Sequence, residues 1–585
     1  MKKKYILSLL IIIGLSVIPK IAYADSLGDR EIFYVNTGFD AYSRLKVSAT
    51  LKNIGDHAYM YIEDDFWNDL TTGQQTAVLI NVKSLTNEFD NHIFPVLTNF
   101  YGPIPDPGID NDSKITFLLS ELIPNIGGYF DTVNQSTKKQ SRISNEREMI
   151  VISAADIGDL PRMQAFVGHE LQHLISYKHK EIDYGVVDDI WINEARSEYA
   201  LTRLGYNEPF RNSHLERRAI ALIQSPTDSL TEWKNLFADY GQVTIFGEYI
   251  ADTYSPQVIA DTLDTSKVGI SELNYALKKN GFADQFETIF GDWMVANYIN
   301  NPSLNNRYGY ERSGLVDLRV APTVKFSGFD EDKTLEYSYN FKDWEPRWYD
   351  FSSFTLGDKD HSTLAIDFTS TSLASFRVAY ILYNKDGSVI VNNVRLSNQE
   401  STVYINNIYD DVQRVVIMPY KTDKISGFVY EENTVPLSLI LFRTELNNEN
   451  EVELSRIPTV VPATFDLKEG DFIRAFGDDD IYIINYAGYK RLVLNPEICL
   501  QYGHLGERGC FDAVNLVTPE VRDAFITSNV YTNGETKDGI LFQMNITGSD
   551  TATLTIINKE KFISDGNTFS SVFQFNSLEQ NSYSR

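Results

Sequence analysis

Short strand-like runs, several of them with alternating apolar and polar residues, occur at intervals between residues 32 and 152 of the chain. Alternation over about four to eight residues is typical of a half-buried strand, because successive side chains point to opposite faces of a sheet. Residues 70–98 have helical spacing instead. The strands predicted in this part of the chain are 32–35, 46–51, 58–62, 114–119, 126–131 and 148–152.

Helical spacing dominates from about residue 160 to 300, where the predicted helices include 231–237 and 243–254. Alternation then returns and continues to the end of the chain, broken by an acidic, Asn-rich run near residue 450. We therefore expect a mixed α+β domain followed by all-β, β-sandwich-like C-terminal domains. The predicted boundaries are 25–305 for the first domain (β-rich lobe to about 185, helical lobe 190–300), 320–445 for the sandwich and 455–585 for a second β-rich domain.

One predicted helix carries two histidines four residues apart, in the run His169-Glu170-Leu171-Gln172-His173. Residues at this spacing lie on one face of a helix, so both imidazoles can bind one metal ion. Zn²⁺ accepts imidazole nitrogen at about 2.0–2.1 Å. Glu170 lies beside that face, where its carboxylate can take a proton from a water activated by the metal. The alternative is a helix with two ordinary histidines.

Glu194 follows the second histidine after twenty residues, at the start of another predicted helix. It can supply the third ligand and leave a fourth position for water, as a catalytic zinc site requires. Glu198 lies one turn further on, where it can hydrogen-bond the far nitrogen of a ligating histidine. The alternative is that both glutamates form a solvated helix edge with Arg196 or Arg203.

The His169–His173 motif, followed by Glu194 and Glu198 in the pattern Asn-Glu-x-x-Ser-Glu, resembles the signature of the gluzincin metallopeptidases, which include thermolysin. Within that group it is most similar to the secreted bacterial hyicolysin-type neutral metallopeptidases. The resemblance covers roughly residues 49–302. It implies a two-lobed zincin catalytic domain, one catalytic Zn²⁺ ion, and hydrolysis of peptide bonds in protein or peptide substrates.

The resemblance also implies a strand that binds the substrate backbone at the edge of the sheet. By its order in the chain, this strand is the segment Gly127, Gly128, Tyr129 and Phe130. An exposed edge offers unpaired N–H and C=O groups to an extended peptide. An ordinary core strand is the alternative.

A hydrogen-bond donor is needed for the oxyanion of the tetrahedral intermediate. The segment Asp239-Tyr240-Gly241 resembles the one that carries a tyrosine donor in aminopeptidase-like gluzincins. We therefore assign this role to Tyr240, with His214 and Tyr249 as alternatives. Tyr240 could also have only a packing role.

The N-terminus carries three lysines, an apolar run at 5–17 and small residues before position 25. This pattern is typical of a secretory signal peptide at 1–24, so we expect a secreted, extracellular protein of bacterial type without a transmembrane anchor. The net charge of −28 argues against nucleic acid and anionic membranes as partners. We expect a monomer.

Cys499 and Cys510 are the only two cysteines, and an exported protein is expected to join them in a disulfide that closes a surface loop. Acidic residues in two turns raise the possibility of bound Ca²⁺, although ordinary turn chemistry is the preferred explanation for both. These residues are Asp106, Asp110 and Asp112 in the first turn and Asp478, Asp479 and Asp480 in the second.

The sequence thus predicts a secreted zinc endopeptidase with Glu170 as its catalytic base. An aminopeptidase on the same scaffold is one alternative, although the Gly-x-Met-Glu-Asn motif that captures the free α-amine in that family is absent. A cell-surface or substrate-binding protein with a vestigial peptidase lobe is the other. The sequence does not assign a role to the C-terminal β domains.

Overall fold

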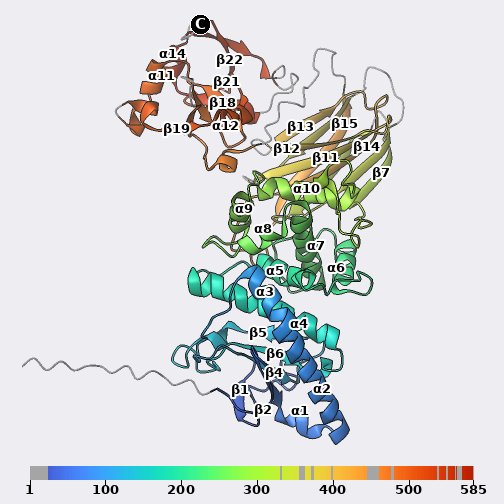
Figure 1. The fold of residues 1–585 in the computed structure, drawn as a ribbon. Coiled ribbons are helices and arrows are strands. Elements are labelled where there is room, and N and C mark those ends of the chain that lie inside the picture. Colours follow the sequence, from blue (N-terminus) through green and yellow to red (C-terminus); the bar gives the residue numbers. More distant parts are fainter. Residues whose placement is uncertain are drawn as a thin grey trace, which may run out of the picture. The chain divides into compact units, whose positions relative to one another are not determined.

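The computed structural model divides into two compact units, residues 1–182 and 183–585 (Figure 1). Residues 1–23 of the predicted signal peptide, the acidic run near residue 450, and Asp478 and Asp479 lie outside the described residues. No described helix is long and apolar enough to cross a membrane. The structure describes residues 24–329, 333–354, 363–370, 374–396, 400–444, 460–475, 480–506, 508–536, 539–547, 551–559, 562 and 569–583.

The first unit is built on a six-stranded sheet with the order β1-β2-β3-β4-β6-β5. β3, β4 and β6 are parallel, whereas β5 runs antiparallel to β6 and forms one edge of the sheet. All six strands fall where alternation predicted them, although β5 is shorter than the predicted 126–131. Their bounds are β1 (Arg30–Tyr34), β2 (Lys46–Ile54), β3 (Ala58–Glu63), β4 (Ile115–Ser120), β5 (Gly128–Phe130) and β6 (Met149–Ser153).

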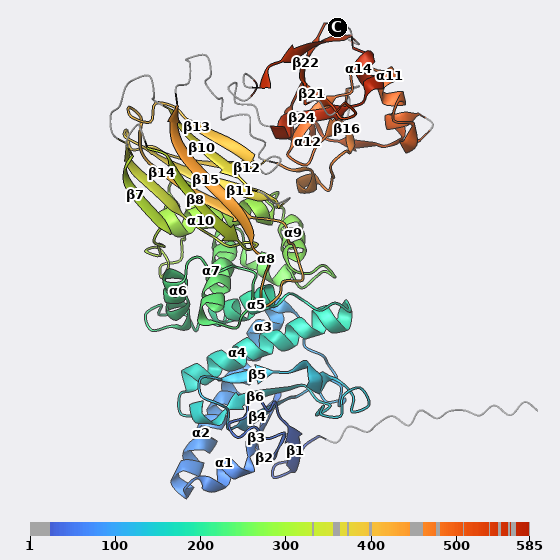
Figure 2. The ribbon, with the colours of Figure 1, turned by 180° about the vertical axis from the view of Figure 1, so that it is seen from behind.

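Helices pack against this sheet, and α4 contacts both β5 and β6 (Figure 2). The Asp159 side chain accepts a hydrogen bond from the Arg162 backbone N–H at the start of α4, and Pro161 lies in its first turn. Met163, Val167 and Leu171 are fully buried along one face, which fixes the rotation of the helix. The helices of this unit are α1 (Asp64–Asp69), α2 (Thr72–Glu88), α3 (Phe94–Tyr101) and α4 (Leu160–Tyr177).

The second unit begins with six helices. The predicted helix at 231–237 is wrong, because the backbone there makes other hydrogen bonds. Leu230 N–H donates to the Trp344 carbonyl, and the N–H groups of Lys234 and Leu236 donate to the Asp239 carboxylate, which caps the next helix. The helices are α5 (Ile190–Arg203), α6 (His214–Gln224), α7 (Phe237–Thr253), α8 (Pro256–Asp261), α9 (Ile270–Lys279) and α10 (Phe286–Ile299).

Two sheets follow, with strand orders β13-β10-β15-β8 and β12-β11-β14-β9-β7. Their inner side chains form one hydrophobic core, so this part is a β-sandwich. The strands are β7 (Val324–Phe329), β8 (Leu335–Phe341), β9 (Tyr349–Phe354), β10 (Thr363–Thr369), β11 (Phe376–Asn384), β12 (Val389–Arg395), β13 (Glu400–Ile405), β14 (Val412–Lys421) and β15 (Val435–Thr444).

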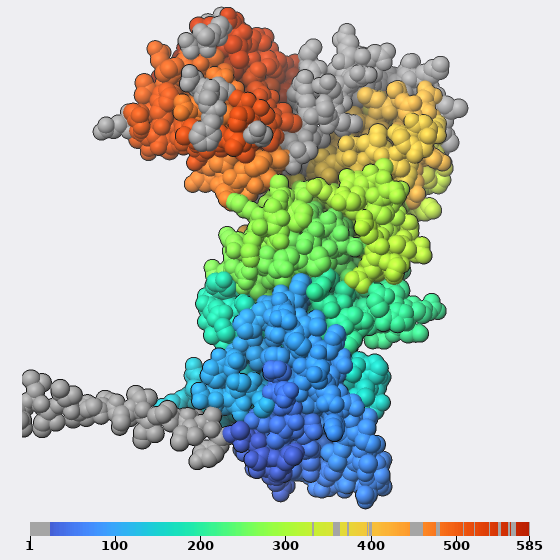
Figure 3. All heavy atoms as spheres, viewed as in Figure 1, coloured from blue at the N-terminus to red at the C-terminus, as the bar shows by residue number. Residues whose placement is uncertain are grey.

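Buried contacts join the sandwich to the helices. Trp344 and Trp348 are fully buried, and the Trp348 indole N–H donates to the Met294 carbonyl at 3.0 Å. The loop between β14 and β15 reaches α5, where Gly427 N–H donates to the Asp189 carboxylate at 2.8 Å. In the space-filling view the helical part and the sandwich accordingly form a continuous surface (Figure 3).

The last part of the chain contains two smaller sheets, β19-β16-β17-β18-β20 and β23-β22-β21-β24. The predicted disulfide between Cys499 and Cys510 is confirmed. The loop that it closes lies at the surface as predicted, with Gly503, His504 and Leu505 exposed, whereas both cysteines are buried in the core of this part. The elements are β16 (Phe472–Ala475), β17 (Ile481–Ile484), β18 (Tyr489–Leu492), α11 (Pro496–Leu500), β19 (Val514–Val517), α12 (Pro519–Ala524), β20 (Ile526–Thr527), β21 (Val530–Asn533), β22 (Leu541–Ile546), β23 (Ala552–Ile557), β24 (Val572–Phe575) and α14 (Ser577–Asn581).

The acidic turn before β4 is held together by its own carboxylates. Asp110 accepts a hydrogen bond from the Asp112 N–H, and Asp112 accepts hydrogen bonds from the Lys114 N–H and the Tyr59 hydroxyl. Asp106 accepts a hydrogen bond from the Ser113 hydroxyl at 2.6 Å. These contacts are ordinary turn chemistry, and calcium binding at this turn stays a prediction.

Glu148 packs beneath this turn. Because its carboxyl group is buried, we expect the stability of the first unit to depend on pH. Its side chain is 2% exposed and accepts one hydrogen bond, from the Ile109 N–H at 3.0 Å. Burial, together with the negative charge of Asp110, raises the pKa of Glu148 to about 7. The folded state therefore holds this proton at pH values where the unfolded state, with a pKa of about 4.3, has lost it.

Stability of the first unit is therefore expected to fall as the pH rises from about 4.3 to 7, by roughly 3 kcal/mol for this group. Glu148→Gln should remove most of that dependence, which urea unfolding at pH 5 and pH 8 measures. The exposed Glu31 in β1 provides the control, since Glu31→Gln should leave the pH dependence as it is in the unaltered protein. An equal pH dependence in the Glu148→Gln protein would contradict the assignment.

Candidate metal centre

α4 presents His169 and His173 on one face, one turn apart. Their ring planes are inclined by 80°, and their Nε2 atoms are 3.1 Å apart. Both side chains are half-buried, whereas Leu171 and Leu174 on the opposite side of the helix are fully buried. Packing of the apolar face therefore holds the two rings in this orientation.

Glu194, in the second turn of α5, completes a group of three possible metal ligands. One ligand atom from each of His169, His173 and Glu194 lies within 4.8 Å of the others. Two nitrogens bound to one tetrahedral zinc at about 2.0–2.1 Å are about 3.3 Å apart, close to the separation of the two Nε2 atoms. The three side chains thus fit a divalent ion such as zinc, with two nitrogen donors and one carboxylate.

Glu170 lies between the two histidines in sequence and is only 8% exposed. Its Oε2 accepts a hydrogen bond from the backbone N–H of Phe130, in β5, at 2.8 Å. A Cβ atom added at Gly128 would lie 2.8 Å from the Val151 carbonyl, and one added at Gly127 would lie 1.8 Å from the Phe166 ring of α4. Both glycines therefore allow the close approach of β5 to its neighbours.

β5 occupies the edge position predicted for it. The Phe130 N–H that contacts Glu170 belongs to this edge strand, so the strand and the carboxylate lie side by side. Tyr129 points the other way: its side chain is 7% exposed and its hydroxyl accepts a hydrogen bond from the Asn36 N–H. Burial raises the pKa of Tyr129 to about 12. The Tyr129 side chain therefore packs in the core, and substrate binding by the backbone of this strand stays a prediction.

Glu198, one turn after Glu194, is 1% exposed and forms a salt bridge with Arg218. Its oxygens also accept hydrogen bonds from His214 Nε2 at 2.8 Å and the Thr244 hydroxyl at 2.9 Å. Burial alone would raise the pKa of Glu198, but Arg218 and His214 hold it well below its usual range. The predicted hydrogen bond from Glu198 to a ligating histidine stays a prediction.

Sequence reasoning did not single out Arg218. Its guanidinium bonds Glu198 through Nη2 at 2.8 Å and Nε at 3.0 Å. The charges of Glu194 and Tyr240 also act on Arg218, together with that of Glu198, and raise its pKa despite its burial. The available signal was the spacing of His214 and Arg218, four residues apart, which places both on one face of α6.

Tyr240 is half-buried in the first turn of α7. The Arg218 guanidinium lies 4.3 Å from the centre of its ring, and its hydroxyl donates to the Asn235 side chain at 3.1 Å. Its role as an oxyanion donor stays a prediction. Tyr249 is excluded from that role, because it is fully buried and its hydroxyl donates to the Arg307 carbonyl.

Comparison with known proteins identifies no family. No protein-family model and no curated protein matches the chain. Among solved structures, a Yersinia pseudotuberculosis-derived mitogen matches at 10% identity over 20% of this chain and 92% of its own, with a TM-score of 0.14. A non-crystalline cellulose-specific carbohydrate-binding module matches at 13% identity over 19% of this chain and 74% of its own, with a TM-score of 0.13. Scores this low carry no conclusion about fold or function.

Proposed function

We propose that the chain is a secreted zinc-dependent endopeptidase with a gluzincin-like catalytic domain, acting on extracellular proteins or peptides. The observation that carries the proposal is the group His169, His173 and Glu194, with its ligand atoms within 4.8 Å of one another. Glu170 lies between the two histidines in the sequence, is buried, and accepts a hydrogen bond from the edge strand. It adds the carboxylate that peptide hydrolysis requires. The disulfide Cys499–Cys510 agrees with an oxidising, extracellular compartment.

The two imidazoles and the Glu194 carboxylate would hold the ion. When bound there, zinc supplies Lewis-acid chemistry that polarises a carbonyl and makes water acidic. α4 orients the two imidazoles through its buried apolar face, and α5 orients Glu194. Arg196, on the same helix, is fully buried in an ion-pair network that fixes α5.

Glu170 holds and moves the proton in this proposal. Its Oε2 accepts the Phe130 N–H, and Oε1 is the atom we assign to the proton taken from the attacking water. The same oxygen then delivers that proton to the nitrogen of the leaving amine as the peptide bond breaks. The buried position of Glu170, 8% exposed, limits proton exchange with bulk water during these two steps.

β5 would bind the substrate by adding an extended peptide to the edge of the sheet. The Gly128 backbone and the Phe130 carbonyl supply the pairing groups, and the strand places the scissile bond beside Glu170 because the Phe130 N–H already contacts that carboxylate. Tyr240 would donate a hydrogen bond to the oxyanion after exchanging its present partner, Asn235. Glu198 and Arg218 hold the surrounding helices in place.

Removal of the metal tests the proposal. The purified protein is expected to digest casein, to contain about one zinc ion per chain by mass spectrometry, and to lose activity on treatment with a chelator. Zinc should restore the activity, and His173→Ala should lose both zinc and activity. The control is His92→Ala, since His92 lies on the helical stretch after α2 and outside the triad. Digestion that survives complete removal of zinc would exclude a metallopeptidase.

A further inference from the structure

A row of three side chains crosses the outer face of the sandwich. The strand register places Tyr383 of β11 opposite Arg414 of β14, and Arg414 opposite Ser352 of β9. In each strand an adjacent residue packs into the sandwich core, so the row itself faces away from the core. The row therefore belongs to the surface of the five-stranded sheet.

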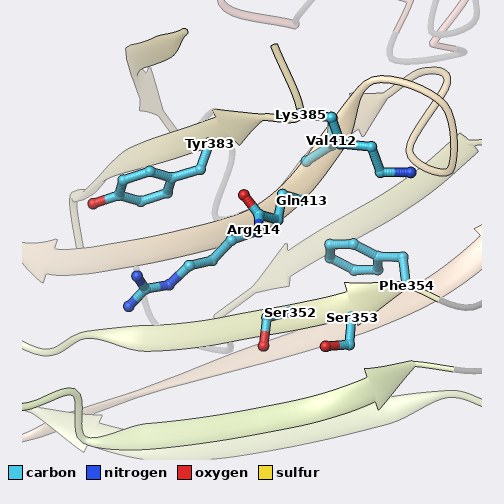
Figure 4. Close-up of a pocket in the computed structure, with 8 residues that line it drawn as sticks. All are labelled: Ser352, Ser353, Phe354, Tyr383, Lys385, Val412, Gln413 and Arg414. Atoms are coloured by element: carbon cyan, nitrogen blue, oxygen red, sulfur yellow. The ribbon is translucent and has the colours of Figure 1, made fainter. Parts of the chain in front are cut away.

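Two cavities adjoin this row and share Tyr383 and Arg414 as lining residues. The first, of about 340 Å³, extends along the ends of β9 and β14 to Lys385 (Figure 4). The second, of about 540 Å³, extends to Arg319 and the C-terminal end of α10. We call the two cavities together the twin pocket. Each has the volume of an ordinary small-molecule site.

The lining of the twin pocket is positively charged in a chain of net charge −28. Arg414, Arg319 and Lys385 line it, and no described carboxylate does. Asp350 holds Arg414 through two hydrogen bonds of 2.7 Å, but Asp350 itself is fully buried and lies behind the lining. Even with Asp350 counted, three positive charges and one negative charge leave a net +2.

Two of these cations have backbone partners only, within the described part of the chain. Arg319 donates to the Ile299 and Asn300 carbonyls at 3.1 and 2.9 Å, at the end of α10. Lys385 donates to the Tyr409 carbonyl. These contacts fix the positions of the two cations but leave their formal charges unneutralised by a carboxylate, so the twin pocket is suited to an anion.

The rest of the lining favours a sugar over a peptide. The Tyr383 ring lies beside Arg414, with the guanidinium 5.0 Å from the ring centre, and presents an aromatic surface to the pocket. The lining of the twin pocket also includes the hydroxyl and amide side chains of Ser352, Ser353, Gln413 and Asn301. β11 and β14 are paired on both sides, so an extended peptide has no free strand edge here. Recognition must use side chains.

We propose that the twin pocket binds an acidic saccharide. A sugar ring packs its C–H face on Tyr383, its carboxylate or sulfate groups lie near Arg319 and Lys385, and the hydroxyl and amide side chains bind its hydroxyls. This inference goes beyond the peptidase activity and is independent of it, since all of these residues lie outside the candidate metal centre.

Isothermal titration calorimetry of the full-length protein tests the site with three probes: heparin oligosaccharides, oligogalacturonates and neutral maltooligosaccharides of equal length. The first two distinguish sulfate from carboxylate. At least one acidic series is expected to bind at least about tenfold more tightly than the neutral one, and more weakly as salt is added. The double variant Arg319→Gln/Lys385→Gln should lose about tenfold or more of that affinity. Tyr383→Ala should weaken binding of the acidic saccharide at high salt as well.

Lys83→Gln is the matched control, because it removes one exposed positive charge from α2 in the other unit. Circular dichroism confirms that each variant is folded. The proposal is overturned if neither acidic series binds, if the pocket variants bind as the Lys83→Gln protein does, or if polyglutamate binds as tightly as the saccharide. The last result would identify an acidic-peptide site instead.

Discussion

Glu170→Gln is expected to lower kcat/KM for a fluorogenic peptide by about 10²–10⁴-fold while zinc stays bound. Glutamine keeps the shape of the side chain, and its Oε can still accept the Phe130 N–H that lies 2.8 Å from Glu170 Oε2. It cannot take a proton from water or return one to the leaving amine. The loss should therefore appear mainly in kcat, with KM little changed.

Zinc content measured on the same preparation separates the base from a ligand. Glu31→Gln, at the exposed position in β1, should keep full activity and serves as the control. Undiminished activity of Glu170→Gln would assign the base to another residue. Loss of zinc together with activity would mean that Glu170 is needed for metal binding. That outcome would also contradict the proposed role of Glu170 as the base.

Arg196→Met is expected to give the largest loss of stability. The Arg196 side chain is fully buried and forms ion pairs with Asp188 and Glu272, and it donates a hydrogen bond to the Thr262 hydroxyl at 3.1 Å. Removing the guanidinium leaves two carboxylates buried without their cation, which costs about 3–5 kcal/mol. Chemical unfolding of the full-length protein measures the change.

Arg196 lies on α5 two residues after Glu194, so the same substitution should also weaken zinc binding. Arg211→Met is the control: its side chain is 84% exposed, and its salt bridge with Glu216 should contribute little. If charge is the cause, adding Glu272→Gln to Arg196→Met should recover part of the stability. A double variant as unstable as the sum of the two single variants would indicate lost packing instead.

The parts of the fold that the sequence predicts well are those set by local pattern. α4 has an apolar face, an N-terminal cap and Pro161 in its first turn, so both the helix and the shared direction of His169 and His173 follow from a single segment. The edge strand follows from its order in the chain. Glu194 follows because its distance from the histidines along the chain resembles a known motif.

The features that sequence reasoning missed depend on contacts between distant segments. Arg218 meets Glu198 from another helix, and the hydroxyl of Tyr249 finds its acceptor at Arg307. The helix predicted at 231–237 does not form, because the backbone around it donates hydrogen bonds to the Trp344 carbonyl and the Asp239 carboxylate instead.

The twin pocket is a similar case. Tyr383, Arg414 and Ser352 come from three strands, and only the register of the sheet places them in one row. Arg319 joins them from the segment after α10. No spacing along the chain connects these residues, so a motif search cannot find the site.

The hydrogen bond from Gly427 N–H to Asp189, at the start of α5, makes the sandwich part of the support for Glu194. The Ile270 N–H makes a second such link, donating to the Ile425 carbonyl of the same loop. A gene fragment ending near residue 305 would keep all three candidate metal ligands but would lose both of these hydrogen bonds. The sandwich is consequently not expected to be exchangeable for another domain without loss. A chimaera that replaces it must keep the β14–β15 loop of this chain.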